Sequence, residues 1–147
     1  MDNVILSYKD LDVWRLGIDL TLRIYEVASH LPAAERYELS SQIRRAVVSV
    51  PSNVAEGHAR RRPKPYLNHV EISLGSLAEL VTCLVIARRL EYITQSQLDA
   101  VMSETDRVGQ MLHGLGRSLE RRIKSQASAL RLCAFLGGLV AVVGVLA

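Results

Sequence analysis

The feature that most constrains this chain is the spacing of its apolar residues, which recur every three or four positions in four successive segments. That spacing gathers apolar side chains on one face of an α-helix. The positions are Val13, Leu16, Leu20, Ile24, Val27 and Leu31; Leu39, Ile43, Ala46, Val47 and Val50; Leu67, Val70, Leu74, Leu77, Val81 and Leu84; and Leu98, Val101, Thr105, Val108, Leu112, Leu115 and Leu119. Short connections join neighbouring antiparallel helices. The sequence therefore predicts an all-α, antiparallel up-down-up-down four-helix bundle.

The first segment carries a second apolar stripe, which consists of Leu11, Trp14, Ile18, Leu22 and Tyr25. A helix that is apolar around so much of its circumference must be covered on more than one side. We expect packing within the bundle to cover one stripe and a neighbouring subunit to cover the other. Asp10 is predicted to cap the start of this helix, and Leu31-Pro32 is its predicted exit, since the residue before proline avoids the helical region.

The second segment, from about Ala34, contains a helix breaker and a helix stop. Pro51 lacks a backbone N–H and is predicted to kink the helix, and Gly57 is predicted to end it in the left-handed conformation. Asn53 and Glu56 lie between them as polar candidates. They would either form a polar pocket or satisfy the backbone groups that the kink frees, and we favour the structural role. Catalysis by Glu56 would need a second acid or a base at a defined spacing, and the sequence supplies none.

Basic residues gather in two places that the bundle would bring together. The segment from His58 to Pro65 reads as a loop and contains Arg60, Arg61, Arg62 and Lys64, while the end of the fourth helix carries Arg117, Arg121, Arg122 and Lys124. In an up-down bundle both lie at the same end, where they would attract phosphates. The alternatives are a solvated basic surface and, for the fourth helix, cations that complement the helix dipole. Further arginines, Arg36, Arg44 and Arg45, would face solvent or a partner.

Composition limits the remaining function classes. The 147 residues are enough for one domain, 49% are hydrophobic, and the net charge is +3 with a pI near 9.1. Cys83 and Cys133 have no metal or redox spacing, and the four histidines (His30, His58, His69 and His113) include no pair one helical turn apart. We therefore expect no metal, no cofactor and no enzymatic activity, and a cytoplasmic location as the default because no secretion signal is evident.

The composition changes abruptly after Arg131. Residues 132–147 carry no charge, but sixteen residues fall short of the roughly 17 to 25 that a spanning helix needs, and they include three glycines. We divide the chain into a four-helix bundle, residues 1–125, and an apolar extension, residues 126–147. The extension would be a membrane tail, a segment that packs within an oligomer, or a disordered appendage. Within the third helix, Gly75 and Ser76 are predicted to permit the close approach of another helix.

Three motifs resemble one known family. The run Leu39–Gly57, the run Gly75–Leu80 and the opening Asp10–Trp14 together resemble the signature of the four-helix-bundle proteins encoded in intervening sequences of bacterial 23S ribosomal RNA genes, over about residues 8–123. That family is similar in fold to accessory proteins of diversity-generating retroelements. The resemblance implies a ring-like homo-oligomer, a pentamer, that binds RNA or DNA together with a protein partner such as a reverse transcriptase. Leu67–Val70 departs from the family pattern, and the apolar tail lies outside it.

The sequence thus favours a non-enzymatic oligomeric bundle that binds nucleic acid through phosphate contacts at Arg60, Arg61, Arg62, Lys64, Arg121, Arg122 and Lys124. Tyr66 is the one aromatic residue beside the basic loop, which favours backbone contacts over base-specific ones. Two alternatives remain. The first is an assembly module that binds no nucleic acid, and the second is a bundle tethered to a membrane by its tail.

Overall fold

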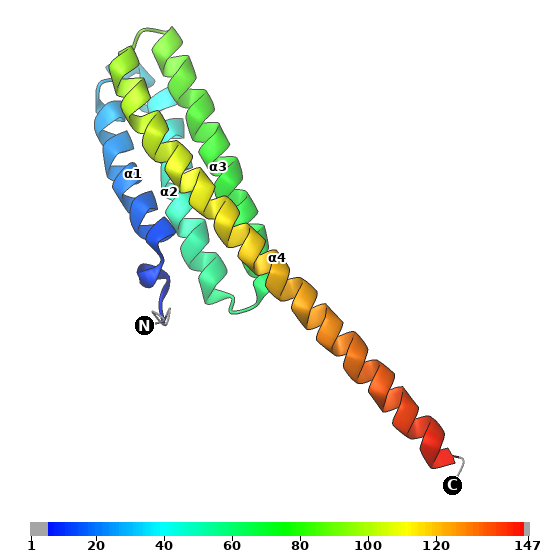
Figure 1. Cartoon of the computed structure of the whole chain (residues 1–147). Helices are drawn as coiled ribbons and strands as arrows, with labels where there is room; N and C mark the ends of the chain where they lie inside the picture. The colour runs from blue at the N-terminus through cyan, green and yellow to red at the C-terminus, as the bar shows by residue number, and fades with distance from the viewer. Residues whose placement is uncertain (1–5, 146–147) are drawn as a thin grey trace.

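The chain folds as a bundle of four helices (Figure 1). The structure is a computed structural model that describes residues 6–145, with side chains described for residues 6–129. The helices are α1 (Asp12–Ser29), α2 (Leu39–Ala59), α3 (Pro63–Arg89) and α4 (Gln95–Val145), and two short 3-10 helices, η1 (Tyr8–Asp10) and η2 (Ala33–Arg36), precede α1 and α2. No strand occurs between residues 6 and 145. The predicted all-α bundle is confirmed.

The predicted apolar stripes form the core. Each helix contacts two others, α1 against α2 and α4, and α3 against α2 and α4, so α1 and α3 lie diagonally across the bundle. The largest side chains that are fully enclosed come from all four helices: Leu20, Ile24, Ile43, Leu80, Leu84, Leu112, Leu119, Val47, Val50, Val54, Val70 and Val108. Burying each such side chain stabilises the fold by about 1.5–3 kcal/mol, so the bundle has a core sufficient for a single domain.

The second stripe of α1 is only partly covered. Leu11 and Trp14 pack against the rim of the core, whereas Leu22 is 67% exposed and Tyr25 is 44% exposed. The stripe therefore leaves an apolar face open on α1 within the single chain, and its cover by a neighbouring subunit stays a prediction.

The start of α1 differs from the prediction. Asp10 does not cap α1; it belongs to η1, where its carboxylate accepts hydrogen bonds from the backbone N–H of Ser7 at 2.9 Å and that of Leu6 at 3.1 Å. Leu11 follows in an extended conformation, and α1 begins at Asp12. Asp10 therefore completes the capping box of η1, whose N-cap is Ser7, and does not cap α1.

The second helix also differs. Its predicted start near Ala34 falls in η2, and α2 begins at Leu39. At the other end α2 continues through Pro51 and Gly57 to Ala59, and no glycine in the described part of the chain has a positive φ. Gly57 is therefore not the helix stop that we predicted. The left-handed residue that follows α2 is Arg61, with φ of 56°.

Close packing explains both Gly57 and Pro51. A Cβ atom on Gly57 would lie 2.3 Å from Cδ2 of Tyr66 and 2.9 Å from Cβ of His69, so only glycine lets α3 approach α2 here. Pro51 is buried against α1, where a Cβ on Gly17 would lie 3.3 Å from the proline Cβ. The Pro51–Gly57 stretch thus serves as a contact surface for two neighbouring helices.

The third helix confirms half of one prediction. Ser76 is buried at the contact with α2, and its hydroxyl donates to Oγ of Ser49 at 2.8 Å. Gly75 is different, since a Cβ there would meet nothing within 4 Å. Gly75 therefore faces open space, and our prediction that it permits close helix approach is wrong.

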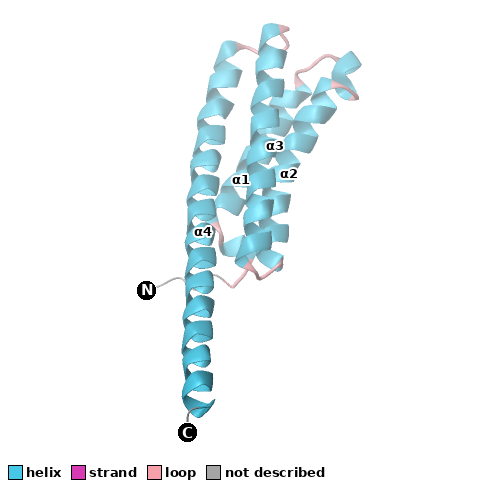
Figure 2. Cartoon of the chain, turned by 90° about the vertical axis from the view of Figure 1, so that its right-hand side faces the viewer, coloured by secondary structure: helices cyan, strands magenta, loops and turns pink. Residues whose placement is uncertain are grey.

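The fourth helix runs past the end of the bundle. α4 is 51 residues long and continues, unaccompanied by another helix, beyond the α2–α3 connection (Figures 1 and 2). It crosses residue 125 without a break, so Arg117, Arg121, Arg122 and Lys124 lie within the helix and the helix-dipole explanation for them does not apply. The side chains of the predicted tail, residues 132–147, including Cys133, lie outside the described part of the chain.

One helix among the described residues is long and apolar enough to cross a membrane by length and composition. It is α3, Pro63–Arg89. Because α3 packs against both α2 and α4, that composition belongs to a core helix.

Candidate nucleic-acid interface

The basic connection is shorter than predicted. Only Arg60, Arg61 and Arg62 lie between α2 and α3, because His58 belongs to α2, and Pro63, Lys64 and Pro65 form the first turn of α3. Pro63 occupies the first helical position, where its missing N–H leaves no bond unmade. The three arginines are all exposed. A three-residue connection between two packed helices therefore holds three guanidinium groups at the bundle end.

Tyr66 anchors this end of the bundle. Its ring packs against Gly57 and meets the His58 ring edge-on, with 6.1 Å between ring centroids. Tyr66 is only 8% exposed, and its hydroxyl is enclosed without a hydrogen-bond partner. Burial raises the pKa of Tyr66 to about 12. The hydroxyl therefore stays protonated and remains a donor that lacks an acceptor.

A cavity of about 350 Å³, which we call the basic cavity, opens beside Tyr66. It is lined by Leu11, His58, Arg61, Arg62, Pro63, Tyr66, Leu115, Ser118, Leu119 and Arg122. Every charged group in this lining is a cation, and no carboxylate faces it. The cavity thus combines an apolar floor with three guanidinium groups, an arrangement that suits an anion carrying a ring or chain.

Three of the seven predicted binding residues meet at this cavity. They are Arg61 and Arg62 from the connection and Arg122 from α4. Arg60, Lys64, Arg121 and Lys124 are exposed but do not line it. Among the residues with described side chains, none of the seven lies within 4.0 Å of a carboxylate oxygen in an ion pair. The seven cations are therefore free of ion pairs within the part of the chain whose side chains the structure describes.

Asn53 and Glu56 belong to a polar seam between α2 and α3. The Asn53 amide donates to the Ser49 carbonyl at 2.9 Å, and its oxygen lies 3.0 Å from Nδ1 of His69. Glu56 is exposed, with a carboxylate oxygen 3.9 Å from the same nitrogen. The seam ties the two helices together, and the predicted role of these residues in satisfying backbone groups at Pro51 stays a prediction. Sequence reasoning missed His69, although its place seven residues before Ser76 indicated the same helix face.

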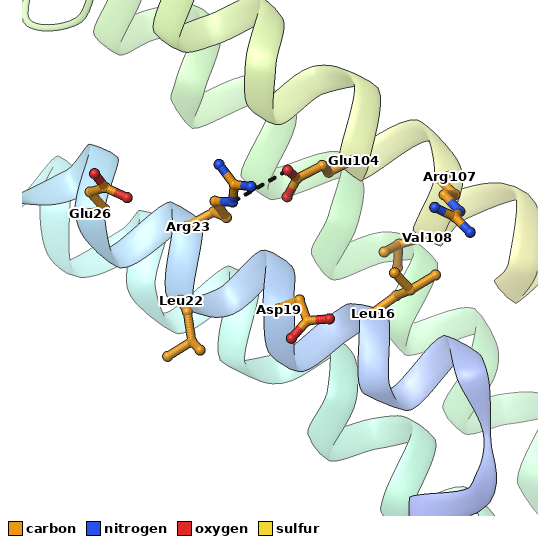
Figure 3. Close-up of a pocket in the computed structure, with 8 residues that line it drawn as sticks. All are labelled: Leu16, Asp19, Leu22, Arg23, Glu26, Glu104, Arg107 and Val108. Carbon is orange, nitrogen blue, oxygen red and sulfur yellow. Dashed lines mark ion pairs between the residues drawn. The ribbon is translucent and has the colours of Figure 1, made fainter.

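The groove between α1 and α4 has a different charge pattern. Its cavity of about 480 Å³ presents acidic and basic side chains together (Figure 3). Nε of Arg23 lies 3.5 Å from a carboxylate oxygen of Glu104, and Asp19, Glu26 and Arg107 complete the charged lining. Three carboxylates against two guanidinium groups leave this groove with no excess positive charge to attract phosphates, so it is a poor nucleic-acid interface.

A second cationic cavity, which sequence reasoning missed, lies at the other end of α2. It measures about 550 Å³ and is lined by Tyr25, Arg36, Tyr37, Ser41, Arg44, Arg45, Val48 and Ser49. We call it the arginine–tyrosine cavity. Its members come from α1, η2 and α2, so their approach depends on tertiary packing. In the sequence, the adjacent pair Arg36-Tyr37 was the feature that could have indicated this cavity.

The described residues offer neither a reactive thiol nor a metal site. Cys83 is buried, and burial, together with the carboxylate of Glu79, raises the pKa of its thiol, which keeps it protonated and unreactive. Within the described part of the chain, no three His, Cys, Asp or Glu residues converge as a metal site would require.

Comparison with known proteins places this bundle in a family. The four helices and their motifs define a small all-α bundle protein, and the sequence model of the 23S rRNA-intervening sequence protein family matches residues 9–114. The chain belongs to that family. A solved structure from Bacteroides thetaiotaomicron, described as a protein with unknown function from the S23 ribosomal protein family, has the same fold with a TM-score of 0.67 at 22% identity. The likeness covers 71% of this chain and 95% of that one. The search of curated proteins returned no match.

Proposed function

We propose that this protein is a non-enzymatic, oligomeric four-helix bundle that binds nucleic acid through phosphate contacts at the α2–α3 end. The observation that carries the proposal is the basic cavity, where Arg61, Arg62 and Arg122 converge and no carboxylate faces them. Guanidinium groups bind phosphate oxygens in a fixed two-donor geometry, and each phosphate they neutralise releases counterions. Arg60, Lys64, Arg121 and Lys124 extend the same charge over the surrounding surface and take the outer phosphates.

A salt titration of binding tests this proposal. Fluorescence anisotropy with a labelled DNA duplex and a structured RNA would give the dissociation constant from about 50 to 200 mM salt. Each phosphate contact to duplex DNA adds about 0.9 to the slope of log affinity against log salt. We expect the triple variant Arg61→Gln, Arg62→Gln, Arg122→Gln to lower that slope by two to three such steps.

The matched control is Arg107→Gln, which removes an exposed arginine of α4 from the groove between α1 and α4, outside the basic cavity. We expect its salt slope to equal that of the unaltered chain. An affinity independent of salt, or equal losses from the control and the triple variant, would contradict phosphate binding at this end.

The exposed apolar residues support the oligomeric part of the proposal. Leu22 on α1 is 67% exposed, and on α3 Ile72 is 50% and Ile86 is 43% exposed. Because α1 and α3 lie diagonally across the bundle, contact between them joins unlike faces of two copies. Such head-to-tail contacts form a ring when the rotation between neighbouring copies closes, and we propose that it closes here. A ring repeats the basic cavity around one face, and the number five follows from the family resemblance.

Light scattering after size exclusion tests the ring. We expect Leu22→Asp and Ile72→Asp each to reduce the mass of the assembly to that of a single chain, since either change disrupts one side of every contact. Assemblies of unchanged mass in both variants would contradict this arrangement.

A second candidate function rests on the course of α4. This helix leaves the bundle alone and runs to Val145, into the segment of the sequence that carries no charge after Arg131. A helix without a polar face needs cover, and a bilayer with anionic lipids would supply it while the flanking arginines meet the headgroups. Flotation with anionic vesicles, comparing the full chain with one ending at Lys124, tests the tether. Full-length protein that stays soluble and monodisperse counts against it.

A further inference from the structure

The arginine–tyrosine cavity is a second place where cations gather without opposing charge. Arg36 is the last residue of η2, Arg44 and Arg45 lie on α2, and all three side chains line the cavity. The guanidinium of Arg45 donates to Oγ of Ser41 at 2.5 Å, which holds that side chain along α2. No carboxylate lines this cavity, so its charge is positive throughout.

The acidic residues nearby in sequence are directed or engaged elsewhere. Glu26 follows Tyr25 but lines the groove between α1 and α4 (Figure 3). Glu35 accepts hydrogen bonds from the Tyr92 hydroxyl at 3.1 Å and from the Leu39 backbone N–H at 3.3 Å. Glu38 is exposed and does not line the cavity. The positive character of the cavity therefore belongs to the folded structure and is not evident from the mixed charges of residues 35–38.

Two aromatic rings distinguish this cavity from the basic cavity. Tyr37 is 82% exposed, so its ring contributes little to the core. Tyr25 is 44% exposed, and the guanidinium of Arg44 lies over its ring, 5.4 Å from the centroid. Nε of Arg44 is enclosed without a hydrogen-bond partner. The cavity thus presents an open aromatic face beside an arginine that forms no ion pair among the described residues.

We propose that the arginine–tyrosine cavity binds single-stranded nucleic acid, with a base stacked on Tyr37 and the adjoining phosphates held by Arg36 and Arg44. Aromatic faces set among cations are the means by which proteins hold unpaired bases and their backbone together. A duplex offers the phosphates but keeps the faces of its bases within its own stack, so the tyrosine favours a single strand.

This inference goes beyond the proposed function, which requires phosphate contacts alone. The two cavities share no residue. Arg44 and His58 are fourteen residues apart on α2, which corresponds to about 21 Å along the helix at 1.5 Å per residue. A single strand bound at both cavities would need several nucleotides to span the distance between them. Duplex binding therefore reports on the basic cavity, and the excess binding of a single strand reports on this one.

The test compares a labelled single strand with the corresponding duplex on the full chain. We expect Tyr37→Ala to weaken single-strand binding about 5- to 150-fold and to leave duplex binding within twofold, while Tyr37→Phe, which keeps the stacking face, stays within twofold on both. Arg36→Gln should lower the salt slope for the single strand by about 0.7. Leu90→Ala is the matched control, since Leu90 is 50% exposed but lies outside the cavity.

Three results would overturn the inference. The first is a loss of less than twofold on the single strand, or an equal loss on both nucleic acids, in the Tyr37→Ala variant. The second is a smaller assembly mass for Tyr37→Ala by light scattering, which would show that a second copy of the chain covers the ring. The third is displacement of the strand by polyglutamate as effectively as by unlabelled strand, which would assign the cavity to an acidic protein.

Discussion

Replacing Gly57 with alanine separates the two roles that a glycine can have in a helix. Because Gly57 lies inside α2 and no glycine of the described chain has a positive φ, alanine suits its backbone and would by itself stabilise the helix by about 1 kcal/mol. Against this, the new Cβ would lie 2.3 Å from Cδ2 of Tyr66 and 2.9 Å from Cβ of His69. Comfortable carbon contacts lie at about 3.5–4.0 Å.

The clash outweighs the propensity. Overpacking a close contact costs about 1–3 kcal/mol, and this site belongs at the upper end because the Tyr66 ring is only 8% exposed and has little room to move. Subtracting the helix gain leaves a net loss of about 2 kcal/mol, or about 4–8 °C in melting temperature for a chain of this size. Urea unfolding followed by circular dichroism measures it. Gly75→Ala is the control, because a Cβ there meets nothing within 4 Å, and we expect it to stabilise the protein by up to about 1 kcal/mol.

A double-mutant cycle with Tyr66→Ala decides the cause. With the ring removed, the cost of Gly57→Ala should fall by at least about 1 kcal/mol, and the contact with His69 accounts for what remains. The reasoning is refuted if the cost is the same in both backgrounds within about 0.5 kcal/mol, since an additive result would place it in the backbone.

Three further predictions concern the bundle itself. Burial raises the pKa of Tyr66 to about 12, so the unfolded chain loses this proton first and the free energy of unfolding falls as the pH rises from about 10 towards 12. Tyr66→Phe should remove that part of the loss, measured by urea unfolding at pH 9 and pH 11. A decline in the variant equal to that of the unaltered chain would contradict it. Leu84→Ala, at a fully enclosed position, should cost about 2–5 kcal/mol with an unchanged urea m-value, and a cost below 1 kcal/mol would mean that the core can collapse around it. Asn53→Ala should cost about 1–2 kcal/mol through its lost bonds to Ser49 and His69, against less than 0.5 kcal/mol for the exposed Asn68→Ala, and equal effects would argue against the seam.

The helical periodicity of the apolar residues was enough to predict most of the fold. The predicted stripes line the core because residues three and four apart must share a face wherever the chain is helical. Gly57 was misread because a glycine that ends a helix and one that admits a neighbouring ring look the same in sequence. Packing decides between them, and the partner, Tyr66, lies on the next helix.

For the candidate sites too, the sequence could predict what depends on connectivity but not what depends on packing. Arg61, Arg62 and Arg122 were predicted to share one end of the bundle, since connectivity alone places them there, and the structure brings them to one cavity. The arginine–tyrosine cavity was missed because Tyr25, Arg36 and Arg44 meet only through the angle at which η2 joins α1 to α2. The predicted boundary at residue 125 does not end α4, because no proline or glycine interrupts the chain between residues 120 and 131 and the helix continues through it.

Because α4 is unbroken, it fixes both the distance and the rotational angle between the basic cavity and the segment beyond the bundle. From Arg122 to residue 132 the helix advances about 15 Å, and each inserted or deleted residue would change that distance by about 1.5 Å and turn the segment by about 100°. A surface that binds the segment after residue 132 would therefore face Arg61, Arg62 and Arg122 at one fixed rotational angle. Inserting two residues near Ser125 would turn the arginines to nearly the opposite side, whereas inserting seven would restore the direction at a greater reach.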